Sequence, residues 1–142
     1  MSAAIRKDAR MPMSTILKLS REEAGCLWEF GLLSEQKDET ALAETLSKQY
    51  PNLRLVLLTL DREGALLYEA ESGCVIRSVR PVNPLVSAVG AGDSFSACFA
   101  WNYLNGASLG ESLNRGVLLS DYVVTQLGAV PEIPPELMDR IR

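Results

Sequence analysis

Apolar residues follow two kinds of spacing along the chain, one typical of strands and the other of helices. The stretch 53–60 is almost continuously apolar, as expected for a strand that is buried on both faces of a parallel sheet. After Arg21, apolar residues recur three or four positions apart, as on one face of a helix. The pattern predicts strands at 15–19, 53–60, 65–70 and 75–79, and helices at 21–33, 39–48, 92–104, 109–126 and just after Pro134-Pro135.

The order of these elements indicates the fold class. A strand, two helices and a second apolar strand are followed by two paired strands and three helices. This order predicts an α/β fold that forms half of a doubly wound sheet flanked by helices. The turn at 61–64 is expected to join two strands as a hairpin, with Gly64 at a positive φ. The 142 residues suffice for one domain, which can bury roughly two-thirds of its unfolded surface.

The segment from Gly90 to Asp93 reads Gly-Ala-Gly-Asp and leads directly into an apolar helix. Its small residues allow a tight turn, and no bulky side chain stands in front of its N–H groups. With the positive end of the helix, Gly90, Ala91 and Gly92 form a candidate anion hole suited to a phosphate. Asp93 lies in the first helical turn, where its carboxylate can accept the proton of an attacking hydroxyl. The alternative is that Asp93 only caps the helix and compensates its dipole.

Two other phosphate-binding motifs do not fit this segment. A dinucleotide fingerprint needs a third glycine at the position of Phe95. A Walker-type loop ends in Gly-Lys-Ser or Gly-Lys-Thr, and no lysine follows Lys48 in the chain.

The stretch 86–99 resembles the C-terminal signature of the ribokinase/PfkB carbohydrate kinases, roughly Asp-Thr-x-Gly-Ala-Gly-Asp-x-Phe. Upstream, 16–23 resembles the strand and turn that carry the family's Asn-x-x-Glu element. The stretch 57–65 resembles its Thr-x-Gly-x-x-Gly nucleotide loop, and 125–129 resembles its last helix and Gly-Ala stop. The form Val-Gly-Ala-Gly-Asp-Ser-Phe is most similar to fructokinase-type members. The resemblance implies the C-terminal part of a ribokinase-like sheet.

The resemblance also implies an activity, which is the transfer of phosphate from ATP to a sugar or nucleoside hydroxyl in the presence of Mg²⁺. In this interpretation Asp93 is the catalytic base, the glycine turn holds phosphoryl oxygens, and Thr59 and Gly64 contact the nucleotide. Glu23 matches a glutamate near the Mg²⁺, which it reaches directly or through water. From the residues alone, Ser20-x-x-Glu23 is a capping box, and one carboxylate can serve both roles. A second capping box, Ser108-x-x-Glu111, is interpreted as structural.

The chain departs from the family pattern at two positions. Asp61 stands where the nucleotide loop has its first glycine, and it is not expected to contact the nucleotide. Ser87-Ala88 replaces the Asp-Thr pair that precedes the glycine turn. Because that aspartate helps to hold a monovalent cation in some relatives, K⁺ activation in the family manner is not implied.

Family members are much longer than this chain, which resembles only their C-terminal portion. We therefore expect residues 1–142 to be one partial domain that lacks the sugar-binding part, whether as a fragment, a truncated gene product or an internal-start product. A face left by the missing part is expected to favour self-association. The alternative function is a non-catalytic nucleotide-binding remnant, or an interaction module that pairs with a separate N-terminal half.

Composition limits the other function classes. The net charge is −4 with scattered basic residues, so neither nucleic acid nor an anionic membrane is an expected partner. The absence of histidine excludes Ser-His and Cys-His catalysis and most transition-metal sites within this sequence. Three cysteines without a Cys-x-x-Cys pair favour reduced, mostly buried thiols and a cytoplasmic location. Helical spacing suggests that four aromatic residues belong to the core: Trp28, Phe95, Phe99 and Trp101.

Overall fold

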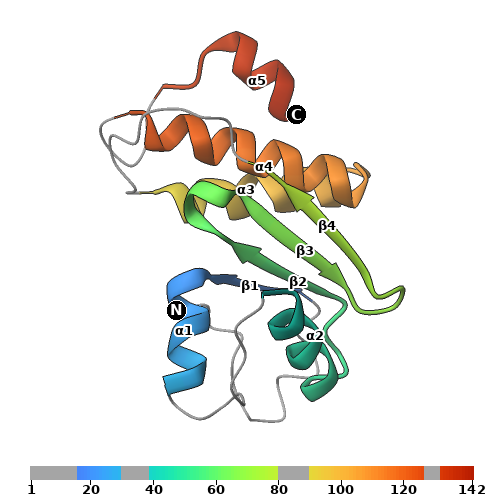
Figure 1. The fold of residues 1–142 in the computed structure, drawn as a ribbon. Helices are drawn as coiled ribbons and strands as arrows, with labels where there is room; N and C mark the ends of the chain where they lie inside the picture. The colour runs from blue at the N-terminus through green and yellow to red at the C-terminus, as the bar shows by residue number, and fades with distance from the viewer. Residues whose placement is uncertain (1–15, 30–38, 80–89, 127–131) are drawn as a thin grey trace. The chain divides into compact units, whose positions relative to one another are not determined.

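The computed structural model describes residues 16–29, 39–79, 90–126 and 132–142 (Figure 1). Every predicted element is present, and most ends differ from the prediction by one or two residues. The helix expected at 21–33 is described as far as Glu29, and the rest of it lies outside the described residues, as does Thr15. In chain order the elements are β1 (Ile16–Ser20), α1 (Arg21–Glu29), α2 (Glu39–Gln49), β2 (Leu55–Thr59), the 3₁₀ turn η2 (Asp61–Glu63), β3 (Ala65–Glu69), β4 (Cys74–Ser78), α3 (Ala91–Leu104), α4 (Leu109–Val124) and α5 (Pro135–Ile141).

The chain divides into two compact units. The first comprises Met1–Asp61 and Ala65–Ile76, and the second comprises Arg62–Gly64 and Arg77–Arg142. The first unit therefore contains most of the sheet with α1 and α2, whereas the second contains α3, α4 and α5.

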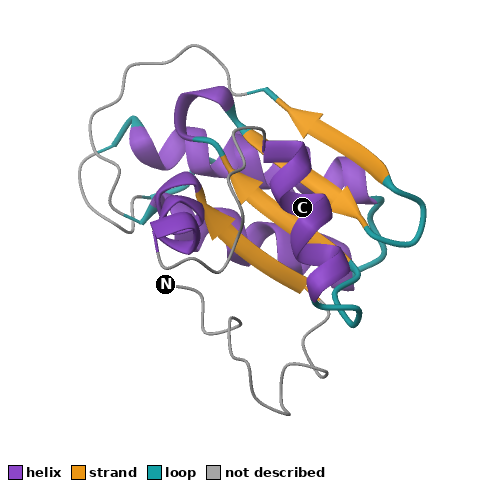
Figure 2. Ribbon diagram, turned by 60° about the horizontal axis from the view of Figure 1, so that its bottom comes forward, coloured by secondary structure: helices purple, strands orange, loops and turns teal. Residues whose placement is uncertain are grey.

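The strands form one sheet in the order β1-β2-β3-β4, which Figure 2 shows side by side. β1 and β2 are parallel, in register from Ile16 opposite Leu55 to Ser20 opposite Thr59, and α1 and α2 form the connection between them. β2 and β3 are antiparallel, with Thr59 opposite Ala65. The expected crossover and the expected hairpin are both confirmed.

The core of the first unit explains the near-continuous apolar run in β2. Val56 and Leu58 pack on the same side as the apolar faces of α1 and α2, whereas Leu55 and Leu57 alternate to the opposite side and are also buried. A strand buried on both faces needs apolar residues at every position, as the sequence pattern predicted. Residues from both helices join this core: Ala24, Leu27, Leu42, Ala43 and Leu46.

The second unit is built on the pair of helices α3 and α4, with α5 against them. Phe95 and Phe99 are buried as predicted, and their rings stack with centroids 6.3 Å apart. Trp101, on the same helix, was also expected in the core, but its side chain is 60% exposed, so that expectation is wrong in this chain. Phe95 and Phe99 are four residues apart and share one face of α3. Trp101 follows Phe99 by two residues and therefore lies on a different face. The side chain of Trp28 lies outside the described residues.

The cysteines are free, as expected, but they are not mostly buried. Cys98 is buried, Cys26 is partly buried and Cys74 is exposed. Cys74 is exposed because it opens β4 directly after the turn that ends at Gly73.

A glycine in α4 sets the separation of α3 and α4. A Cβ atom at Gly116 would lie 3.0 Å from the ring of Phe95 and 3.3 Å from the carbonyl oxygen of Phe95. We expect Gly116→Leu to lower the free energy of unfolding by about 1–3 kcal/mol, because the side chain overpacks this contact. Urea unfolding of the variant and of the parent chain measures the difference.

Gly110, in the same helix, supplies the matched control. A Cβ atom there would meet nothing within 4 Å. Gly110→Ala should therefore leave the stability unchanged or raise it by up to about 1 kcal/mol through helix propensity. A Gly116→Leu chain as stable as the parent would mean that the helices do not approach each other at this glycine.

Candidate functional site

The Gly-Ala-Gly-Asp segment forms the start of α3. Gly90 is the N-cap residue and has φ 82° and ψ −4°, a left-handed conformation that glycine adopts without strain. The helix begins at Ala91, one residue before the predicted start, and the amide of Ser94 donates to the Gly90 carbonyl oxygen at 2.9 Å. Gly92 thus has helical geometry, and the left-handed residue of the turn is Gly90.

The first turn of α3 has the geometry of an anion site. The amide N–H groups of Ala91, Gly92 and Asp93 precede the first intrahelical hydrogen bond and have no partner within the helix. No side chain caps them, because the N-cap is glycine. Asp93 is exposed, and its carboxylate makes no hydrogen bond or ion pair with any residue that the structure describes. Among the described residues, Asp93 thus does not cap the helix through its side chain. Its negative charge in the first turn still compensates the helix dipole.

Two of the other candidate residues lie at the carboxyl ends of the parallel strands. Ser20 and Thr59 are register partners at the last positions of β1 and β2. Glu23 follows in the first turn of α1, where its amide donates to the Ser20 hydroxyl and its Oε1 accepts from the Ser20 amide, both at 3.2 Å. The capping box is thus confirmed, and it holds Glu23 at the same sheet edge as Thr59. In open α/β sheets, ligands bind at this edge.

The hairpin turn between β2 and β3 contains a short 3₁₀ element. Asp61 to Glu63 form a single 3₁₀ turn, and Gly64 follows with φ 93°, as predicted. Asp61 also has a positive φ, 52°, which the sequence analysis missed. Aspartate is one of the few residues other than glycine that tolerate this conformation. Asp61 is exposed, and it stands where the resemblance places the first glycine of the nucleotide loop.

Among the residues that the structure describes, the donor set fits Mg²⁺ as a hydrated ion. No cluster of three acidic, cysteine or histidine side chains suitable for a metal occurs within the described ranges. Mg²⁺ often keeps several waters and binds through one or two carboxylates together with substrate phosphates. Glu23 fits this mode of binding, since it is a carboxylate at the ligand-binding edge of the sheet.

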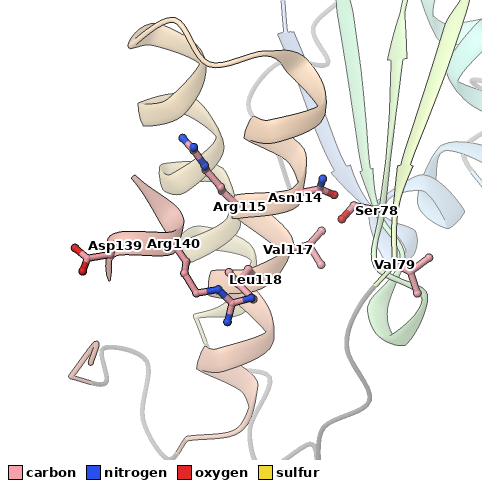
Figure 3. Close-up of a pocket in the computed structure, with 8 residues that line it drawn as sticks. All are labelled: Ser78, Val79, Asn114, Arg115, Val117, Leu118, Asp139 and Arg140. Atoms are coloured by element: carbon pink, nitrogen blue, oxygen red, sulfur yellow. The ribbon is translucent and has the colours of Figure 1, made fainter. Parts of the chain in front are cut away.

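A pocket in the second unit was not anticipated from the sequence. Its volume is about 470 Å³, and Figure 3 shows Asn114, Val117 and Leu118 along α4 with Ser78 and Val79 at the end of β4. Arg115 on α4, together with Asp139 and Arg140 on α5, completes the lining. These residues form no contiguous motif, so only the packing of α4, α5 and β4 reveals the pocket.

The pocket and the glycine turn both belong to the second unit. Gly116, between the pocket residues Arg115 and Val117, packs against Phe95, three residues after Gly92. At 3.6 residues per turn, the pocket residues Asn114, Val117 and Leu118 lie on the other side of α4 from Gly116.

Some expectations fall outside the described residues or need correction. Ser87-Ala88 and Gly128-Ala129 lie outside the described residues. At the second predicted capping box, Ser108 Oγ accepts from the Glu111 amide at 3.1 Å, while the Glu111 carboxylate lies 3.9 Å from Arg115. Within the described ranges, no helix is long and apolar enough to span a membrane.

Comparison with known proteins supports the family assignment. The chain is 33% identical over 81 residues to the ATP-dependent 6-phosphofructokinase of Thermoanaerobacterium thermosaccharolyticum, a match that covers 57% of this chain and 24% of that protein. It is 30% identical over 91 residues to the ribokinase of Lactococcus lactis, which covers 64% of this chain and 29% of that protein. The chain spans about a quarter of the length of the curated relatives that it matches.

Solved structures agree with the fold. The adenosine kinase of Sinorhizobium meliloti matches with a TM-score of 0.69 and 28% identity, over 84% of this chain and 33% of that one. The ribokinase of Arabidopsis thaliana, solved with ribose and ATP, matches with a TM-score of 0.75 and 23% identity, over 93% of this chain and 42% of that one. The expected ribokinase-like α/β fold is confirmed. The model of the pfkB family carbohydrate kinases matches residues 4–136, and the chain belongs to this family.

Proposed function

We propose that this chain is the nucleotide-binding and phosphoryl-transfer part of an ATP-dependent sugar or nucleoside kinase. The observation that carries the proposal is the start of α3, where three amide N–H groups without helical partners lie beside an exposed carboxylate. Family membership supports a carbohydrate kinase in general. Within this site we assign phosphate binding to the backbone of Gly90, Ala91 and Gly92, and proton acceptance to Asp93.

The amide groups of the glycine turn stabilise charge on the phosphoryl group during transfer. Backbone donors at a helix start are oriented before the reaction and need no reorganisation as negative charge moves toward the leaving oxygen. Gly90 and Gly92 leave the approach to these donors open, because neither has a side chain.

Asp93 acts on the other reactant. Its carboxylate orients the acceptor hydroxyl and takes the proton of that hydroxyl as the oxygen–phosphorus bond forms. This role requires that the carboxylate be free of other partners, as it is among the described residues. The acceptor is a furanose-type sugar or a nucleoside, in keeping with relatives named as ribokinase and adenosine kinase.

Resemblance to the family supports roles for Glu23 toward Mg²⁺ and for Thr59 toward the nucleotide. When bound, Mg²⁺ neutralises charge on the ATP phosphates, and Glu23 holds it directly or through water. Thr59 and Gly64 contact the nucleotide from the end of β2 and from the turn that follows it.

The pocket beside α4 receives the base and ribose of the nucleotide. Its volume of about 470 Å³ falls in the range of small-molecule sites. Apolar atoms from Val79, Val117 and Leu118 offer surfaces for a flat ring, and Ser78 and Asn114 offer hydrogen bonds.

A second candidate function is a nucleotide-binding module without catalysis. The departure from the family pattern at Asp61, which stands where the nucleotide loop has its first glycine, favours it. The two candidates differ in one respect: only the kinase couples ATP consumption to a sugar.

We expect the polypeptide of residues 1–142 to bind ATP but not to phosphorylate a sugar by itself. The reason is that it matches about a quarter of each curated relative, and we infer that the sugar contacts come from polypeptide outside these residues. Calorimetry with ATP and Mg²⁺ measures the binding, and a coupled assay with a panel of pentoses, hexoses and nucleosides measures the turnover. Sugar-dependent ATP consumption well above background by this polypeptide would show that it contains the acceptor site.

A further inference from the structure

The side-chain amide of Asn102 joins three helices of the second unit. Asn102 lies on α3 and is only 2% exposed. Its Oδ1 accepts a hydrogen bond from Arg115 Nη1 at 2.6 Å. Its Nδ2 donates to the carbonyl oxygens of Ile141 at 2.7 Å and Cys98 at 2.9 Å. Both donors and the acceptor of the buried amide are therefore used.

One of these partners lines the pocket, and another follows two residues that line it. Arg115 lines the pocket from α4, and Ile141 ends α5, whose Asp139 and Arg140 line it from the other side. The carbonyl of Ile141 is at the end of its helix and has no acceptor role within it, so Asn102 takes the place of a C-terminal cap. The Asn102 side chain thus binds both the Arg115 guanidinium of α4 and the end of α5, and these two helices contribute Arg115, Asp139 and Arg140 to the pocket.

Packing alone does not explain an asparagine at this position. α5 already has an apolar contact with the rest of the unit, through Leu137 and Ile141 against Cys98, Leu119 and Val123. An aliphatic side chain would extend that contact without the cost of burying an amide. It would leave the Arg115 guanidinium without its short hydrogen bond, however. The feature that only a polar residue supplies is the fixed position of Arg115.

We propose that Asn102 is a positioning residue for nucleotide binding, which holds Arg115 and α5 in the arrangement that receives the base and ribose. This inference rests on the proposed function of the pocket. Arg115 donates one N–H of Nη1 to Asn102, and its Nη2 lies 3.9 Å from Glu111 Oε2, so other N–H groups remain on the guanidinium. Those groups recognise acceptor atoms of the nucleotide, and their direction is set by the bond to Asn102.

A double-mutant cycle tests whether Asn102 acts through Arg115. ATP binding is measured by calorimetry for the parent, Asn102→Leu, Arg115→Met and the double variant. Each single variant should weaken ATP binding by roughly tenfold, the range for a hydrogen bond to a charged group. The double variant should bind no more weakly than Arg115→Met alone, because Asn102 has nothing left to position. Unchanged ATP affinity in Asn102→Leu, or a full additional loss in the double variant, would overturn the inference.

The labelling rate of Cys98 reports separately on the docking of α5. Cys98 Sγ lies 3.7 Å from the Ile141 carbonyl oxygen, and burial raises the pKa of its thiol, with Arg115 and Asn102 acting in the opposite direction. In a chain with Cys26→Ser and Cys74→Ser, a thiol reagent should label Cys98 faster when α5 loosens. Leu137→Ala is the matched control, since it loosens α5 without touching Arg115. If Leu137→Ala raises the labelling rate as much as Asn102→Leu and weakens ATP binding equally, Asn102 acts only through α5, and the inference is wrong.

Asn102→Asp keeps the inference testable if Asn102→Leu does not fold. Aspartate has the same size and keeps an acceptor for Arg115 but loses the donors to the carbonyls of Ile141 and Cys98. Its ATP affinity should stay within about threefold of the parent value, while Cys98 labels faster. A tenfold loss in a folded Asn102→Asp chain would contradict the role assigned to Arg115. If the parent chain itself does not bind ATP, the proposed function fails and the inference fails with it, whereas parent-like binding by the variants overturns the inference alone.

Discussion

Replacing Asp93 by asparagine is expected to lower sugar-dependent ATP consumption by about 10²–10⁴-fold, the usual cost of removing a general base. The variant is to be made in a polypeptide that contains these residues and consumes ATP in a sugar-dependent manner, and the rate is measured with saturating sugar and ATP. Asparagine has the same shape but cannot accept the proton. Because Asp93 is exposed and its carboxylate makes no hydrogen bond or ion pair with described residues, the free energy of unfolding should change little.

Asp61→Asn is the matched control for this prediction. Asp61 is another exposed aspartate, and asparagine tolerates its φ of 52° as well as aspartate does. This variant should retain the parent rate, and both variants should retain nucleotide affinity, because the base acts on the acceptor. Near-parent turnover by Asp93→Asn would remove Asp93 from the catalytic role.

Gly92→Val is expected to have the largest effect on binding, a loss of most of the affinity for ATP. Gly92 lies inside α3 with helical geometry, so valine can adopt its backbone conformation at little cost to the fold. Its branched side chain would stand beside the amide groups that receive the phosphate and would keep the anion away from them. Calorimetry with ATP and Mg²⁺ measures the affinity, and thermal unfolding verifies that the variant is folded.

Ser108→Ala separates loss of binding from loss of stability. Ser108 caps α4 through its bond to the Glu111 amide, and its removal should cost about 0.5–2 kcal/mol of stability. It should leave ATP affinity unchanged. A folded Gly92→Val chain that binds ATP like the parent would reduce the glycine turn to a tight helix start.

The fold could be predicted because its signals are local. The near-continuous apolar run of β2 is long enough to predict a buried strand. In α4, apolar residues three or four positions apart recur often enough to predict a helix. The capping box of Ser20 and Glu23 involves residues only three apart, so its hydrogen bonds follow from the sequence directly. The positive φ of Gly64 was predictable for the same reason.

The features that sequence reasoning missed depend on contacts between distant segments. The pocket brings Ser78, Asn114 and Arg140 together from three elements, and no spacing in the sequence reports that packing. The bond from Asn102 to Ile141 spans 39 residues. Trp101 was placed in the core on periodicity, yet periodicity identifies a stripe of the helix and does not say what covers it. Asp61 was assigned to an ordinary turn because aspartate gives a weaker signal for positive φ than glycine does.

The chemistry of the site was predictable at the level of residue types. The segment from Gly90 to Asp93 was recognisable because it combines two glycines, an acidic residue and the start of an apolar helix. Glu23 was harder to assign, since a capping role and a role near Mg²⁺ use the same carboxylate. The structure confirms the first role and leaves the second as a proposal.

The central claim, that α3 begins with a phosphate site, is tested most directly by following backbone amides during an ATP titration. In nitrogen-15 correlation spectra of the 142-residue chain with Mg²⁺ present, the amide signals of Ala91, Gly92 and Asp93 should shift strongly as ATP is added. Signals of Val117 and Leu118 in the pocket should shift with them along the same saturation curve. Saturation of the chain with ATP while the three amides at the start of α3 stay unmoved would contradict the account.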